Sequence, residues 1–75
     1  MKKTERVARL QDRLKEALVV RGIKAIELSE KSDIPKGAIS YYLSGKSSPK
    51  ADRLNLICST LNVSEAWMLG YDVPM

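Results

Sequence analysis

Apolar residues recur three and four positions apart along most of the chain, which is the spacing that buries one face of a helix. The first helix is predicted to begin with Thr4 as its N-cap and to end near Gly22. Its apolar positions are Val7, Leu10, Leu14, Ala17 and Leu18. No segment alternates between apolar and polar residues for long, so we expect no sheet.

A second helix is predicted from about Ala25 to Ser32, with Ile26 and Leu28 directed inward. It should stop at Asp33, because aspartate tolerates the left-handed backbone that a sharp turn requires.

Pro35 marks the beginning of the third helix. Its ring presets the backbone for a helix start and disfavours helix at Ile34. This helix should therefore begin at Pro35 or Lys36 and last to Leu43 or Ser44.

The rest of the chain predicts a loop and two more helices. Residues 45–49 are loop-like in composition, and helical spacing then returns at Leu54, Ile57, Cys58 and Leu61 until Asn62. Ser64 is an N-cap for a short fifth helix that Gly70 closes. We expect one all-α domain over residues 1–75, compact and five-helical, with helices over about 4–70 and with residues 71–75 as a tail or the start of a linker.

The segment from Ala25 to Ser44 has the features of a helix-turn-helix. Two short helices that cross steeply need a small residue where they approach, apolar anchors and a permissive turn residue. Ser29 is the small residue and Asp33 the turn residue, and the anchors are Leu28, Ile34, Ile39 and Tyr42.

The third helix should present a polar face to solvent, because Ile39, Tyr42 and Leu43 occupy its inner side. The residues predicted on the outer side are Lys36, Gly37, Ser40, Tyr41 and Ser44. Lysine and serine can donate to base edges, a tyrosine ring can pack on a thymine methyl, and a glycine allows close approach of the backbone to DNA. Lys46 and Ser47, in the following loop, have donors for the DNA backbone or are simply solvated.

Charge and cysteine content narrow the class of protein. Thirteen Lys and Arg against nine Asp and Glu give a net charge of +4, which favours polyanionic partners such as nucleic acid. Cys58 is the single cysteine, so no internal disulfide can form and a reducing, cytoplasmic location is expected. Neither a signal peptide nor a membrane span is predicted. No histidine is present, and no metal, cofactor or small-molecule substrate is expected.

Three other interpretations compete with DNA binding. Ser47 and Lys50 have the S-x-x-K spacing of some hydrolases, but this short match arises easily by chance and the chain is not expected to be an enzyme. The basic first helix could lie on a membrane, although acidic residues interrupt its basic face. A protein-interaction or antitoxin-like regulatory module is the stronger alternative, built on an apolar cluster that could instead simply close the core. The cluster comprises Trp67, Met68, Leu69, Tyr71 and Val73.

From Leu14 to Trp67 the sequence resembles the Cro/CI-type helix-turn-helix of phage and bacterial repressors. The matching residues are Gly22-Ile23, Leu28-Ser29-Glu30-Lys31, the run from Ile34 to Lys46, Pro49, Leu54, Leu61-Asn62-Val63-Ser64 and Trp67. Residues 64–75 are similar to the end of the DNA-binding domain in CI-type repressors of temperate phages.

The resemblance implies a lambda-repressor-like fold and repression of transcription through double-stranded operator DNA in a bacterial host cell. It implies a homodimer on DNA, with a further C-terminal domain outside this chain as one route to pairing. By position, Lys36, Gly37, Ser40 and Tyr41 would read bases, and Lys46 and Ser47 would contact the backbone. Three positions depart from the family pattern: Lys24 replaces the usual Ser/Thr cap, Ala25 a glutamine and Asp33 a turn glycine.

Overall fold

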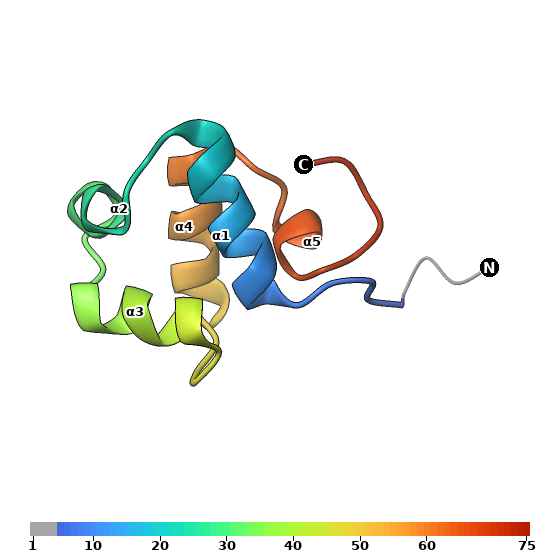
Figure 1. The fold of residues 1–75 in the computed structure, drawn as a ribbon, viewed down its shortest axis with the longest axis horizontal. Helices are drawn as coiled ribbons and strands as arrows, with labels where there is room; N and C mark the ends of the chain where they lie inside the picture. The colour runs from blue at the N-terminus through green and yellow to red at the C-terminus, as the bar shows by residue number, and fades with distance from the viewer. Residues whose placement is uncertain (1–4) are drawn as a thin grey trace.

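The structure, a computed structural model, describes residues 5–75, so the predicted N-cap Thr4 lies outside the described residues. The described part of the chain forms five helices joined by short loops (Figure 1). They are α1 (Leu10–Arg21), α2 (Ala25–Ser32), α3 (Lys36–Ser44), α4 (Ala51–Leu61) and α5 (Glu65–Met68). This is the all-α architecture that the apolar spacing predicts.

Helices α1 and α4 pack against each other at the centre of the molecule. In Figure 1, α2 and α3 lie to one side of this pair and α5 lies to the other. Each helix contributes to one core, whose residues with less than 2% exposure include Leu14, Leu28, Ile39, Ile57 and Met68. The anchor residues predicted for the helix-turn-helix, Leu28, Ile34, Ile39 and Tyr42, are all buried.

The prediction that Ile26 points inward is wrong, because its side chain is 46% exposed. Leu28, two positions further along α2, is fully buried. Residues two apart in a helix lie on nearly opposite faces, so both could not face the same core.

The start of the first helix is also later than predicted. Helix α1 begins at Leu10 with Arg9 as its N-cap, and Val7 is 62% exposed in the preceding extended segment. The physical reason is a contact with the other end of the chain, since the backbone N–H groups of Val7 and Ala8 donate to the carbonyl oxygen of Gly70 at 2.7 and 3.2 Å.

Gly70 can accept these bonds because it has no side chain. Its φ is +103°, and a Cβ at this position would lie 2.0 Å from the carbonyl oxygen of Ala8. Next to it, Arg6 and Tyr71 form an isolated antiparallel β-bridge. We call residues 6–8 and 70–71 the terminal clasp.

Residues 71–75, for which the sequence predicts a tail or linker, fold back onto the helices. The N–H of Ser64 donates to the carbonyl oxygen of Met75 at 2.6 Å, and Val73 and Met75 pack against the core. Within the described residues, no helix has the length and apolar character needed to cross a bilayer.

Candidate nucleic-acid interface

The turn between α2 and α3 is built around Asp33, as predicted. Asp33 adopts the left-handed conformation, with φ 60° and ψ 29°. The hydroxyl of Ser29 donates to the carbonyl oxygen of Ile34 at 2.5 Å across the turn. Because Ile34 is also 98% buried, with 2% of its surface exposed, the turn is fixed by both a hydrogen bond and an apolar anchor.

The start of α2 is capped in one direction only. Lys24 is the N-cap, and a lysine side chain has no acceptor for the first N–H groups of the helix. The reverse bond forms, since Glu27 Oε1 accepts from the backbone N–H of Lys24 at 2.9 Å. Glu27 therefore stabilises an N-terminus that lacks the usual Ser/Thr side chain.

Helix α3 has the two faces that the sequence predicts. Ile39 and Tyr42 are buried, with 0% and 5% of their surfaces exposed, and Leu43 is partly buried. The exposed residues of the helix include all five that were predicted, Lys36, Gly37, Ser40, Tyr41 and Ser44. Tyr41, 54% exposed, is the one aromatic side chain among these five residues. We call these five residues the α3 face.

The loop after α3 continues the α3 face. The N–H groups of Lys46 and Ser47 donate to the carbonyl oxygen of Tyr41 at 3.0 and 3.5 Å, which holds the loop against the helix end. The ammonium nitrogen of Lys46 lies 5.6 Å from the centre of the Tyr41 ring. Lys46, Ser47 and Tyr41 are all exposed, so the solvent-facing aromatic side chain has a cation beside it and a serine in the loop that follows.

Sequence reasoning missed Arg53, which supports this surface from α4. Its Nη1 donates to the hydroxyl of Tyr42 at 3.2 Å. The hydrogen bond to Tyr42 raises the pKa of Arg53, and the charge of Asp52 contributes less, so the guanidinium remains cationic. The two residues are separated by a loop, so no local pattern in the sequence could pair them.

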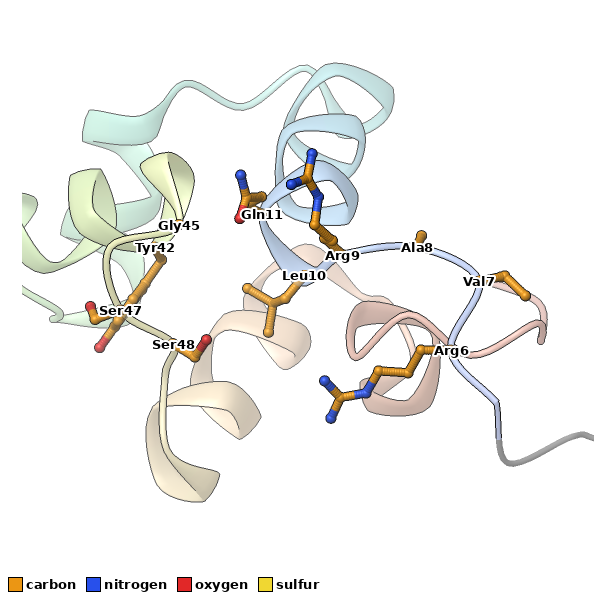
Figure 2. Close-up of a pocket in the computed structure, with 10 residues that line it drawn as sticks. All are labelled: Arg6, Val7, Ala8, Arg9, Leu10, Gln11, Tyr42, Gly45, Ser47 and Ser48. Atoms are coloured by element: carbon orange, nitrogen blue, oxygen red, sulfur yellow. The ribbon is translucent and has the colours of Figure 1, made fainter.

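A hollow of about 510 Å³ lies between the N-terminal segment and the α3–α4 loop (Figure 2). Sequence reasoning missed this hollow as well. Its lining residues are Arg6, Val7, Ala8, Arg9, Leu10, Gln11, Tyr42, Gly45, Ser47 and Ser48. It shares Ser47 with the loop beside the α3 face.

A helix-turn-helix family model matches residues 14–68, which is more than half of the chain. The chain belongs to the Cro/CI-type helix-turn-helix family. The α2–turn–α3 unit is the helix-turn-helix motif that characterises this family.

The domain also has the fold of a solved transcriptional regulator from Listeria innocua. The TM-score is 0.74 at 19% sequence identity, over 89% of this chain and 63% of that one. This helix-turn-helix domain therefore spans less than two thirds of the length of that regulator. A comparison with curated proteins found no match.

The apolar cluster considered as a docking surface belongs largely to the core of the helix-turn-helix domain. Trp67 is 6% and Met68 is 1% exposed, and Leu69 and Val73 pack against the same core. The alternative that the sequence left open, core closure, is the one confirmed.

Proposed function

We propose that this domain represses transcription as a phage CI-type repressor, by inserting α3 into the major groove of an operator. The observation that supports this most is the α3 face: five exposed residues on the second helix of the motif, next to a loop that presents Lys46 and Ser47. A major groove admits one α-helix and displays a distinct pattern of donors and acceptors for each base pair.

The residues of the α3 face have different tasks in this proposal. Lys36, at the start of the helix, donates to guanine or to a phosphate, and Ser40 pairs with base edges. Tyr41 packs its ring on a thymine methyl or donates to a phosphate. Gly37 and Ser44 allow the backbone to approach the groove closely.

The loop residues Lys46 and Ser47 contact the phosphate backbone. Such contacts supply affinity without sequence preference and make binding depend strongly on salt. The backbone hydrogen bond from Lys46 to Tyr41 holds these two residues together. The phosphate contacts of the loop therefore have a fixed spacing from the base contacts of α3.

Two copies bind as a homodimer, on half-sites about one helical turn apart. A single small domain with few base contacts discriminates weakly, and pairing multiplies that discrimination. A C-terminal domain beyond this chain is one means of pairing the copies.

The experiment begins with selection of a preferred duplex from a random pool. Affinity is then measured for that duplex and for a scrambled one across a series of salt concentrations. Lys36→Ala or Tyr41→Ala should cost about 1–3 kcal/mol on the preferred duplex and little on the scrambled one. A reporter carrying the selected site within its promoter tests whether occupancy represses.

Lys46→Ala is the matched comparison, because it removes one cation from the loop and leaves the α3 face intact. It should weaken binding to both duplexes alike and flatten the salt dependence. If Lys36→Ala also weakens both duplexes equally, Lys36 has no reading role. If the wild-type protein selects no duplex from the pool, the repressor proposal fails.

A further inference from the structure

The hollow of Figure 2 is lined by two arginines and two serines that come from distant parts of the chain. Arg6 and Arg9 come from the N-terminal segment, and Ser47 and Ser48 come from the α3–α4 loop. Gln11, at the start of α1, lies between them. Neither these arginines nor Gln11 belongs to the α3 face.

The terminal clasp fixes the position of this arginine-bearing segment. Gly70 accepts hydrogen bonds from Val7 and Ala8, and the Arg6 guanidinium lies 5.8 Å from the centre of the Tyr71 ring. An extended segment held by backbone bonds loses little further conformational freedom when it meets a ligand. The clasp therefore fixes the backbone that carries Arg6 and leads into Arg9.

The other wall of the hollow is attached to the end of α3. A Cβ at Gly45 would lie 2.2 Å from Gln11 Oε1, so the glutamine amide packs directly against the residue that ends α3. Ser47, two residues further on, is bonded through its N–H to Tyr41. Any ligand in the hollow is thus held at a fixed position relative to the α3 face.

We propose that this hollow holds one phosphate of the DNA backbone, as a clamp separate from the α3 face. The inference rests on the proposed function, since α3 must lie in a groove for a flanking phosphate to reach the clamp. Guanidinium groups bind phosphate oxygens in a two-pronged geometry, and hydroxyl and amide groups supply further donors.

Asp12 is the local competitor for this phosphate. Its Oδ2 lies 3.4 Å from Arg9 Nε, and both side chains are more than half exposed. An exposed ion pair of this kind contributes little free energy, so a phosphate can replace the carboxylate as the partner of Arg9. The clamp thus has an arginine whose resting partner is easily displaced.

The test uses the preferred duplex with single phosphates replaced, one at a time, by neutral methylphosphonates. Wild-type protein is compared with Arg9→Gln, with the charge-preserving Arg9→Lys and with Lys31→Gln. Lys31 is an exposed lysine at the end of α2 that does not line the hollow. Circular dichroism melts establish that each variant is folded.

The clamp predicts that one phosphate of the duplex distinguishes the two proteins. Replacing that phosphate by a neutral methylphosphonate should weaken DNA binding by the wild-type protein, but should weaken binding by Arg9→Gln little further. Arg9→Gln should also lower the magnitude of the slope of log affinity against log salt by about 0.9. The ratio of wild-type affinity to Arg9→Gln affinity should therefore change about threefold between 50 and 200 mM salt. Arg9→Lys should keep most of the slope, and Lys31→Gln should match wild type.

Two results would overturn the clamp. In the first, Arg9→Gln and Arg6→Gln both keep the wild-type salt slope and the wild-type response to each methylphosphonate, while Lys36→Ala still loses sequence preference. In the second, inorganic phosphate shifts the NMR signals of the hollow in an Arg9-dependent way, but no single duplex phosphate affects wild-type and Arg9→Gln binding differently. That result would assign the hollow to a free anion. Absence of wild-type binding to the duplex would instead refute the proposed function itself.

Discussion

The guanidinium of Arg13 lies over the indole ring of Trp67, 4.6 Å from the ring centre, and its Nη1 donates to the Trp67 carbonyl oxygen at 2.9 Å. One side chain of α1 therefore covers the aromatic face of α5 and satisfies a carbonyl at its end. Helix α5 has only four residues, too few for a helix that is stable alone, so such tertiary contacts must hold it in place.

Arg13→Ala should lower the free energy of unfolding by about 2 kcal/mol, because it removes both a cation–π contact and a charged hydrogen bond. Arg13→Lys keeps the charge but loses the planar stacking, so it should recover only part of this loss. Urea unfolding followed by Trp67 fluorescence measures both. Arg9→Ala, at an exposed arginine, is the control and should change stability by less than about 0.5 kcal/mol. A loss in Arg13→Ala no larger than that of the control would contradict the role given to Arg13.

Asp33 stands at the turn where the family usually has glycine, and its φ is 60°. Asp33→Gly should stabilise the fold by about 0.5 kcal/mol, because relief of left-handed strain slightly exceeds the entropy that glycine adds to the unfolded chain. Asp33→Ala should destabilise it by about 1 kcal/mol, since alanine lacks the local hydrogen bonding that lets aspartate adopt this conformation. Chemical denaturation of the three proteins decides this, and Asp33→Ala as stable as wild type would show that the turn is not strained.

The helix-turn-helix could be predicted from sequence because its determinants are local. Asp33 and Pro35 lie within three residues of each other, and each acts on its own backbone. Buried and exposed residues of α3 followed from helical periodicity alone. The side of this helix that carries Lys36 and Tyr41 was accordingly assigned correctly.

The beginning of α1 could not be predicted in this way. Val7 continues the apolar spacing of the helix, yet its N–H is bonded to Gly70, far away in sequence. A hydrogen bond between the two ends of a chain leaves no periodic signal. The hollow next to this segment was missed for the same reason, as its walls come from residues 6–11 and 42–48.

Cys58 gives the fold a defined dependence on alkaline pH. The thiol is 2% exposed, and burial raises its pKa from 9.0 to about 11, with a smaller contribution from the charge of Glu65. Well below pH 9 the thiol is neutral in both the folded and the unfolded chain. Above it the unfolded chain loses the proton first, so stability falls as pH rises toward 11, by at most about 1.4 kcal/mol per pH unit.

Cys58→Ala isolates this effect, because tyrosines and lysines titrate over the same range in both proteins. The difference in unfolding free energy between wild type and Cys58→Ala should be constant from pH 6 to 8 and should shrink between pH 9 and 11. In folded wild type at pH 8, a thiol reagent should modify Cys58 much more slowly than in urea. A difference that stays constant up to pH 11 would mean that the thiolate is as well solvated in the folded chain as in the unfolded one.

Gly37 separates the requirements of the fold from those of DNA binding. It lies in the first turn of α3, is exposed, and has nothing within 4 Å of where a Cβ would be. Gly37→Ala should therefore stabilise the domain by about 0.5–1 kcal/mol, through higher helix propensity and a less flexible unfolded chain.

On DNA the added methyl group of Gly37→Ala would occupy the space through which the backbone approaches the groove, so affinity for the preferred duplex should fall. Ser59→Ala, at an exposed position of α4, is the matched control and should leave affinity unchanged. Thermal melts and duplex titrations of the same samples check both effects, and a Gly37→Ala protein that is more stable and binds as well as wild type would show that DNA does not approach α3 at this residue.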